Sequence, residues 1–428
     1  MAGVRWFVLL ALFVPVAAAR AQEVESDPSP GRLERAGITG SIRTAYWSST
    51  RDLDRVDHVG TGMAWLKVKR PLSESVSFLA EGWMALSGPA EDPDSGSELR
   101  EAFVDVRRNR LDVRAGRQIL AWGRADGVNP TDNLTGEDLT LLAPDDDDRR
   151  LGTVAVRVSY YFGDVSVSAY LLPEFRGHRF PLPSPPPGLT FSRDAPDWPG
   201  DQWALRVEQT GRAIDWSLSY FDGLDLLPDL GLPAATTTSR AADVIDISHH
   251  RVRILGADMA ATAGRFGLRA EGAYVHTEDP DGRDPYTKNP FVFLVAGADR
   301  TFREHLNLNV QYLFRFVRQF SAIDRSLPGL EAVVAAQQAV LGSQTHRFQH
   351  GASFRAAYRW LHDTLEAECA AAGYFEPRGL AFRPKVTYAV TDHWKALVGA
   401  EMFRGQAASI FGLLKPNSTV YFEARWSF

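Results

Sequence analysis

The sequence predicts an all-β fold, a transmembrane antiparallel β-barrel. Three observations predict it. Segments that alternate between apolar and polar residues recur over residues 36–428, the connections between them are alternately tight and long, and the last segment runs to the final residue. A period of two is typical of a strand with one apolar and one polar face. A membrane barrel turns these two faces toward the lipid and toward the lumen.

The first 21 residues have the features of a secretory signal. Arg5 precedes an apolar run over residues 6–19, and small residues precede an expected cleavage site after Ala21. Removing this segment takes away Arg5 and Arg20, which changes the formal net charge of -6 to -8.

Residues 22–35 are interpreted as a periplasmic leader and residues 36–428 as the barrel, with no second domain. Beyond the signal, no apolar run approaches the ~20 residues that a membrane helix needs. The mean hydropathy of -0.21 agrees with strands that are apolar on one face only. The single cysteine, Cys369, excludes an intramolecular disulfide and leaves no pair of cysteines for a metal site.

Eighteen strands are predicted, with sixteen as the alternative, and every second connection is tight. Phe162-Gly163-Asp164 is a tight connection, whereas the loops 120–151 and 320–344 are long. Bacterial barrels have short periplasmic turns and long extracellular loops, so an even strand count places both ends of the barrel on the periplasmic side. The strands are predicted to begin near Ala36, Asp57, Ser73, Ser97, Arg110, Gly152, Asp164, Gly200, Arg212, His249, Arg265, Asn289, Glu304, Thr345, Asp363, Arg378, Asp392 and Asn417.

The last strand, Ser418 to Phe428, is predicted to close the barrel against the first strand near residues 38–46. Its apolar face consists of Val420, Phe422, Ala424, Trp426 and Phe428. A terminal strand that ends in Phe resembles the assembly signal of Gram-negative outer-membrane proteins. The resemblance implies Sec-type export, contact with outer-membrane lipid, and recognition of Phe428 by the barrel assembly machinery. An edge strand of a soluble sandwich is the alternative.

The polar faces of the strands are predicted to line a wet lumen, because an arginine that faces lipid costs about 2–4 kcal/mol at the membrane midplane. Charges near two turns are expected to form ion pairs, Asp105 with Arg114 and Arg107 with Asp112 at one turn, and Arg355 and Arg359 with Glu366 and Glu368 at the other. Other inward bases lack an obvious partner, so the lumen is expected to be net basic. The predicted pore-lining bases are Arg43, Lys67, Lys69, Arg157, Arg315, Arg347, Arg383, Lys385 and Lys395, and Arg251 and Arg253 likewise lack an obvious partner.

The loop 120–151 is predicted to fold into the barrel mouth and narrow it. It carries apolar residues such as Trp122 and Leu134, which an unstructured surface loop would not need, and loops of this length are usually functional or disordered. Its acidic run, residues 145–148, is expected to lie against the wall that carries Arg383 and Lys385. The residues predicted to form the constriction are Trp122, Arg124, Asp126, Asn129, Asp132, Arg149 and Arg150.

The stretch from the fifth to the seventh strand resembles known porin-like barrels. Gly116-Arg117-Gln118 resembles a stretch of alginate-export-type barrels. The pattern Trp122-Gly123, Asn129-Pro130-x-Asp132 and Pro173-Glu174-Phe175 is similar to that of a related group of uncharacterised proteobacterial porin-like barrels. The resemblance implies an eighteen-stranded pore, which carries anionic polysaccharide in the export-type members. The Asn-Pro-x-Asp portion and the four aspartates depart from the alginate exporter pattern, so the fold carries over more safely than the substrate.

These observations predict a porin-like outer-membrane channel that passes small or polymeric hydrophilic solutes, with anions preferred. They predict no enzyme activity, no cofactor, no metal and no nucleic-acid partner. Two alternatives remain open: a plugged barrel that acts as a surface adhesin or anchor, and an outer-membrane hydrolase. For the hydrolase, the best candidate group is His249 and His250, beside Asp246 and Ser248.

Overall fold

The computed structural model describes residues 32–50, 58–88, 94–182, 185, 188–193, 200–233, 244–321, 327 and 329–428. The predicted signal segment, 1–21, lies outside the described residues, as does most of the predicted leader. Of that leader, only the short helix α1 (Arg32–Arg35) is described.

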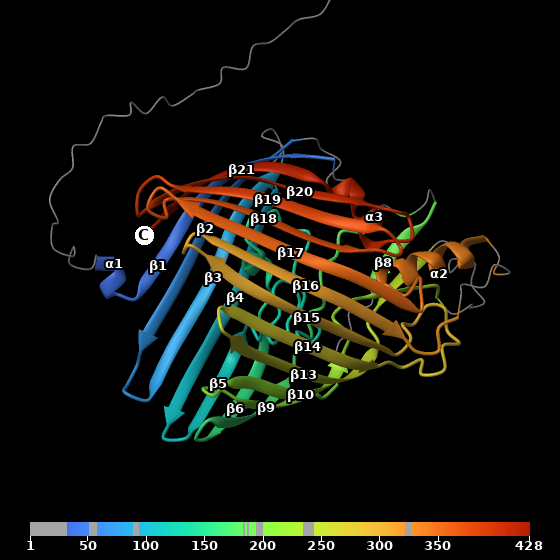
Figure 1. Ribbon diagram of the computed structural model, residues 1–428, viewed down its shortest axis with the longest axis horizontal. Coiled ribbons are helices and arrows are strands. Elements are labelled where there is room, and N and C mark those ends of the chain that lie inside the picture. Colours follow the sequence, from blue (N-terminus) through green and yellow to red (C-terminus); the bar gives the residue numbers. More distant parts are fainter. Residues whose placement is uncertain are drawn as a thin grey trace, which may run out of the picture.

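Eighteen strands form one closed antiparallel sheet, which confirms the predicted fold and strand count (Figure 1). Each strand pairs with the next barrel strand along the chain, and each begins within three residues of its predicted start. The strands are β1 (Ile38–Ser49), β2 (His58–Pro71), β3 (Val76–Gly88), β4 (Asp94–Arg108), β5 (Leu111–Gln118), β6 (Thr153–Phe162), β7 (Val165–Leu172), β9 (Gln202–Gln209), β10 (Ile214–Leu224), β13 (Arg251–Ala263), β14 (Phe266–His276), β15 (Phe291–Phe302), β16 (Leu306–Val317), β17 (Phe348–Trp360), β18 (Leu365–Tyr374), β19 (Gly379–Ala389), β20 (Trp394–Gly405) and β21 (Thr419–Ser427).

The last strand closes the ring against the first, as the terminal strand predicted. β1 and β21 pair from Ser41↔Ser427 to Ser49↔Thr419. The backbones of Gly40 and Phe428 exchange two further hydrogen bonds, each with an N···O distance of 3.0 Å. A closed ring satisfies every strand edge, which an open sheet cannot do in lipid.

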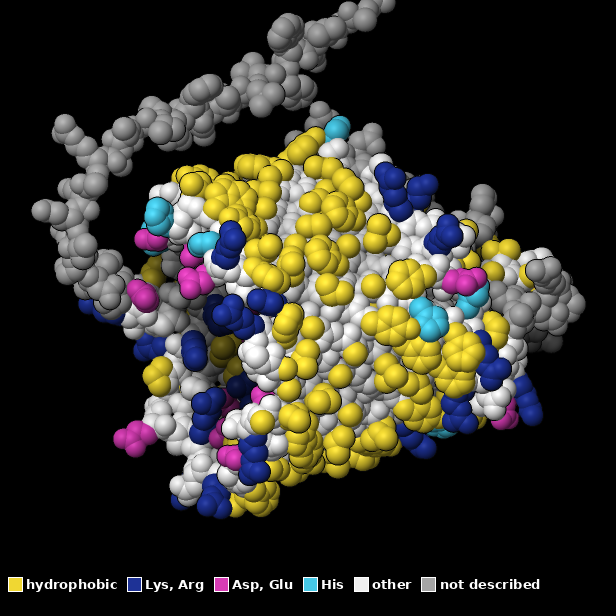
Figure 2. Space-filling view, in the orientation of Figure 1, with side chains coloured by type: hydrophobic (Ala, Val, Ile, Leu, Met, Phe, Trp, Pro, Cys, Tyr) yellow, Lys and Arg dark blue, Asp and Glu magenta, His cyan; other side chains and the backbone are white. Residues whose placement is uncertain are grey.

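The alternating side chains place an apolar surface on the outside of the wall. In β6, Val156, Val158 and Tyr160 are exposed, whereas Ala155 and Ser159 are buried. The face in Figure 2 shows hydrophobic side chains over the middle of the strands, while charged side chains and histidines gather toward the two ends. This is the surface that a lipid-facing wall requires.

The short connections and the long connections lie at opposite ends of the barrel. The end with the tight hairpins, here called the turn side, also holds α1 and the last residue (Figure 1). Its turns use left-handed residues, such as Asn109 with φ 56° and Gly163 with φ 68°. Such residues match the twist of the strands that they join. The opposite end, with the long connections, is called the loop side.

The loop side carries a folded cap instead of separate loops. This mouth cap consists of a three-stranded sheet, β8 (Thr190–Arg193), β11 (Asp229–Gly231) and β12 (Val244–Ser248), together with the helices α2 (Gly329–Leu341) and α3 (Ile410–Leu413). The cap has an apolar core of its own, in which Ile245, Val334 and Leu341 are almost fully buried. Among the described residues, no helix has both the length and the apolar character to cross a membrane.

Candidate functional site

The segment 119–152 leaves the wall early and enters the lumen. β5 ends at Gln118, which is fully buried and donates its side-chain amide to Ala155 O at 2.9 Å. Gly123 follows with φ 97°, and a Cβ there would lie 2.7 Å from both carboxylate oxygens of Glu271. Only glycine therefore permits this close approach of the loop backbone to the opposite wall.

The first half of the loop is anchored to the wall from β9 to β16. Arg124 contacts Glu208 on β9 and Asp258 on β13, both at 2.6 Å. Glu271 on β14 accepts hydrogen bonds from the backbone N–H groups of Arg124, Ala125 and Thr131 and from the Thr131 hydroxyl. Three of these four donors are backbone groups, so the Glu271 carboxylate fixes the position of the loop backbone and not only that of the Thr131 side chain.

Apolar side chains fill the space between this half of the loop and the wall. Trp122 and Leu134 are 6% and 4% exposed, and they belong to a buried cluster with inward-facing residues such as Tyr170, Phe293 and Leu313. The Trp122 ring meets Tyr170 edge-on at 5.3 Å. The predicted polar, wet lumen is therefore not found on this side, because the apolar anchors of the loop pack against apolar partners on the wall.

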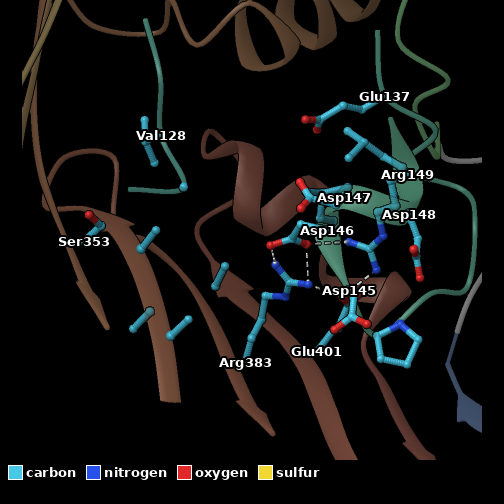
Figure 3. Close-up of a pocket in the computed structure, with 18 of the residues that line it drawn as sticks. Val128, Glu137, Asp145, Asp146, Asp147, Asp148, Arg149, Ser353, Arg383 and Glu401 are labelled. Atoms are coloured by element: carbon cyan, nitrogen blue, oxygen red, sulfur yellow. Dashed lines mark hydrogen bonds and ion pairs between the residues drawn. The ribbon is translucent and has the colours of Figure 1, made fainter. Parts of the chain in front are cut away.

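The second half of the loop is held by ion pairs to the opposite wall, as Figure 3 shows. A short 3₁₀ helix, Asp146–Arg149, presents its side chains to β19, β20, β21 and β1. The acidic run lies against the wall of Arg383 and Lys385, as predicted. The pairs are Arg383 with Asp146 at 2.6 Å, Lys385 with Asp145 at 3.1 Å, Arg425 with Asp145 at 3.0 Å, Arg149 with Glu401 at 2.6 Å, and Arg43 with Asp148.

The loop carboxyls differ in their proton affinity. Burial raises the pKa of Asp145, but the charges of Arg425 and Lys385 outweigh it, so the pKa lies below its usual value. The pKa of Asp146 is likewise lowered, because Arg383 outweighs burial. Burial prevails at three other carboxyls, whose pKa values are raised despite a nearby arginine: Asp132, Glu137 and Asp148.

A cavity of about 1170 Å³ remains between the loop and the wall from β16 to β21. Small side chains on the wall, namely Ser353, Ala370 and Ala381, leave this space open. Figure 3 shows Val128 of the loop on the same side of the space as Ser353, with the acidic helix and Arg383 across from them. The cavity also reaches His178 and Phe411 near the mouth cap. We call this space the passage.

Carboxylates outnumber basic side chains in the lining of the passage. The acidic side chains are Asp126, Asp132, Glu137, Asp145, Asp146, Asp147, Asp148, Glu368 and Glu401, and the basic ones are Arg149, Arg150, Arg355, Arg383 and Lys385. Each of these five bases forms an ion pair. By contrast, Asp147 is 93% exposed and 3.7 Å from Arg150, and Asp126 forms no ion pair among the described residues.

The residues predicted to form the constriction all lie in this loop assembly. Trp122 and Arg124 hold it to one wall and Arg149 to the other. Asp132 and Arg150 join the two halves at 2.9 Å, and Asp132 also accepts from the Trp122 backbone at 3.2 Å. Those that line the passage are Asp126, Asn129, Asp132, Arg149 and Arg150.

The predicted pore-lining bases differ in their partners and in their exposure. Four bases that lack an obvious partner in the sequence have one in the structure: Arg43, Arg383 and Lys385 pair with the loop, and Lys67 lies 2.7 Å from Glu81. Lys69 and Lys395 are exposed near the turn side, and Arg157 is half-buried on the inner face. Arg251 and Arg253 both contact Asp222, at 2.6 and 3.3 Å.

Two of the predicted bases do not line the pore. Arg315 is covered by the end of α2, where it donates to Gly342 O at 2.9 Å, and its guanidinium lies over Phe291 at 4.4 Å. Arg347 precedes β17 and lies 5.8 Å from the ring of Phe316, which faces outward. Strand parity fails for Arg347 because the residue stands outside the paired strand, where the backbone no longer dictates its face.

The sequence predicted the turn-side ion pairs correctly but missed the wall partners of the loop. Asp105 lies 3.0 Å from Arg114, Arg107 3.9 Å from Asp112, Arg355 contacts Glu368, and Arg359 lies 2.5 Å from Glu366. The missed partners include Glu271, Asp258 and Glu401. Parity identifies Glu271 and Glu401 as inward acids, but contacts across the lumen have no signal in a single sequence.

The histidines proposed for a hydrolase form hydrogen bonds at the mouth cap. His250 Nδ1 lies 2.8 Å from Asp229, and His249 Nδ1 lies 2.7 Å from Asp225 O. Lys288, 4% exposed, contacts Asp229 at 2.7 Å and Asp225 at 3.2 Å. Among the described residues, no group of three or more His, Cys, Asp or Glu side chains is arranged to hold a metal ion.

Comparison with known proteins identifies a family and a fold. Residues 75–428 match the model of a family described as "Protein of unknown function (DUF1302)". The crystal structure of Acinetobacter baumannii OccAB2 is similar, with a TM-score of 0.53 at 11% sequence identity over 91% of this chain and 97% of that chain. Pseudomonas aeruginosa OccD3 (OpdP) has a TM-score of 0.53 at 10% identity over 92% and 91%. No curated protein matches in sequence.

Proposed function

This chain belongs to the family described as "Protein of unknown function (DUF1302)", and from the geometry of its lumen we propose that it is an outer-membrane channel for small hydrophilic solutes. The passage carries the proposal. A barrel of 16–18 strands leaves an aqueous space unless something fills it. Here the loop fills one side with apolar side chains and leaves a charged space of about 1170 Å³ on the other.

The proposed orientation places the turn side in the periplasm and the loop side, with its cap, at the cell surface. The short turns lie on the same side as α1 and Phe428, which supports it, because bacterial barrels are threaded in this way. The apolar wall requires outer-membrane lipid as its environment. Sec-type export through residues 1–21, and recognition of the strand that ends in Phe428 by the barrel assembly machinery, belong to the same proposal.

We propose that the passage prefers cations to anions, which reverses the expectation from the sequence. That expectation rested on basic side chains without partners. The five bases in the lining are instead paired, while Asp126 and Asp147 keep carboxylates that no close ion pair neutralises. Fixed charges in a narrow aqueous passage with low-dielectric walls attract ions of the opposite sign.

Planar-bilayer recording tests both parts of the proposal. The purified protein should form discrete conducting channels, and the reversal potential in a KCl gradient should have the sign of a K⁺ preference. The double variant Asp126→Asn and Asp147→Asn should move the reversal potential toward zero. A matched control, Asp363→Asn and Asp392→Asn, removes two exposed carboxylates at the turn side and should leave it unchanged. An anion-selective wild type would show that the paired bases still govern the passage.

A second candidate function, a plugged surface anchor, is favoured by the mouth cap. The cap has its own buried core and a polar network around Lys288, so it presents an ordered surface over the lumen. A folded protein that never conducts in the bilayer, even after removal of cap residues 329–341, would support the anchor and contradict the channel.

A further inference from the structure

A basic groove lies on the outer face of the barrel, at the turn-side ends of β14, β15 and β16. It encloses about 600 Å³ and is lined by Arg265, Arg300 and Arg303 together with apolar residues such as Leu308 and Tyr358. Figure 2 shows Lys and Arg side chains gathered toward the turn-side end of this face, next to the hydrophobic band. The groove is therefore at the boundary between the apolar wall and water.

Arg300 faces outward and is held in place by two aromatic rings. It pairs with Leu308 across β15 and β16, so the two side chains share the outer face. Its guanidinium lies 5.0 Å from the ring centre of Phe266 and 4.5 Å from that of Phe302. Stacking of this kind fixes the guanidinium plane and reduces the entropy that a ligand would otherwise have to remove.

The three arginines lack acidic partners. Other arginines at the turn side are paired, such as Arg212 with Asp164 at 3.1 Å. Among the described residues, by contrast, no carboxylate lies within ion-pair distance of Arg265, Arg300 or Arg303, although Glu304 stands in the same turn. The Nε of Arg300 is buried and has no hydrogen-bond partner. A buried charged donor without a partner is costly, so this groove is incomplete without an anion.

We propose that the groove binds the phosphate headgroup of an anionic phospholipid. Guanidinium groups bind phosphate oxygens through paired, charge-assisted hydrogen bonds. Leu306, Leu308 and Tyr358 continue from the arginines onto the apolar wall, where the acyl chains would lie. The proposal rests on the membrane location given under the proposed function, because the turn side then meets the periplasmic leaflet, but it does not depend on conduction.

Native mass spectrometry of the detergent-solubilised protein with added phosphatidylglycerol tests the proposal. The triple variant Arg265→Gln, Arg300→Gln and Arg303→Gln should lower phosphatidylglycerol occupancy about tenfold or more, the effect of losing one charge-assisted hydrogen bond. The matched control, Arg108→Gln, Arg110→Gln and Arg212→Gln, removes the same charge from other turns of this side and should retain wild-type occupancy. Phosphatidylcholine should bind the wild type weakly.

Three results would overturn the proposal: equal loss in the triple variant and the control, equal binding of phosphatidylcholine, or displacement of the lipid by inorganic phosphate at the same concentration. The last would assign the groove to a soluble phosphate. The single variant Arg303→Gln, at an exposed turn residue, should show a smaller loss in the same direction if the triple variant fails to give a heat-modifiable barrel. The triple variant should keep wild-type conductance, so failure of this site and failure of the channel are distinguishable.

Discussion

Replacement of Glu271 should release the first half of the loop while leaving the barrel and the second half intact. Glu271 is 4% exposed. Its Oε2 accepts from the backbone of Arg124 at 2.9 Å and of Ala125 at 3.1 Å, and its Oε1 accepts from the Thr131 N–H and hydroxyl, both at 2.8 Å. One carboxylate on β14 therefore ties two points of the loop to the wall.

The expected magnitude follows from these hydrogen bonds. In Glu271→Ala, three backbone donors lose their acceptor, and a buried unsatisfied donor costs about 1–3 kcal/mol. With the lower figure for each donor, the three donors together weaken the attachment by about 3 kcal/mol. This shifts the equilibrium toward the detached segment roughly 100-fold. Glu271→Gln keeps one acceptor oxygen and should show about half of the free-energy change.

Hydrogen–deuterium exchange measures this detachment directly. The amides of Arg124, Ala125 and Thr131 should exchange roughly 100-fold faster in Glu271→Ala, because local opening sets the exchange rate. The amide of Asp138 donates to Arg149 O at 2.7 Å in the other half of the loop and should keep its protection. Unchanged exchange at the three amides, in a variant that still forms a heat-modifiable barrel, would refute the role given to Glu271.

Three further predictions concern pH, assembly and the mouth cap. Acidification from neutral pH should reduce the proposed cation preference. The three loop carboxyls whose pKa is raised by burial lose their negative charge first, and the two whose pKa is lowered lose it last. Reversal potentials measured at decreasing pH will check this. Deletion of Phe428 should lower the yield of heat-modifiable barrel in outer membranes, because the Phe428 backbone closes the ring through its hydrogen bonds to Gly40. A normal yield with altered conductance would contradict this prediction. Lys288→Met should make the cap sensitive to protease, because Asp225 and Asp229 lose a buried cation, a change that typically costs about 3–5 kcal/mol.

The wall of this barrel was predictable because each strand obeys a local rule. Alternation decides which side chains face lipid, and the tight turns decide where each strand begins. In β6, for example, every second residue, Val156, Val158 and Tyr160, is exposed. Ion pairs across a tight turn, such as Asp105 with Arg114, follow from the same register because their sequence separation is small. No long-range information is needed for either inference.

The interior was not predictable to the same degree, because its contacts join residues that are far apart in sequence. Arg149 and Glu401 lie 252 positions apart, and Arg124 and Asp258 lie 134 apart. The composition of the loop indicated that it folds inward, and its aspartates indicated a basic wall. It could not indicate that those aspartates pair with the bases of the wall, the observation on which the proposed cation preference rests.

The geometry of the acidic run supports the proposed cation preference of a passage whose wall is rich in bases. Four consecutive aspartates repel one another unless each charge is compensated, and a 3₁₀ helix turns successive side chains in different directions. Asp145, Asp146 and Asp148 turn toward separate bases on the wall, and the remaining one, Asp147, points into solvent. The acidic run thus neutralises bases of the wall and presents one largely exposed carboxylate, Asp147, whose nearest base is Arg150 at 3.7 Å. Under the proposed function, the sign of the field in the passage therefore depends on Asp147, which is 93% exposed, and on Asp126, which forms no ion pair among the described residues, and not on the number of bases in the lumen.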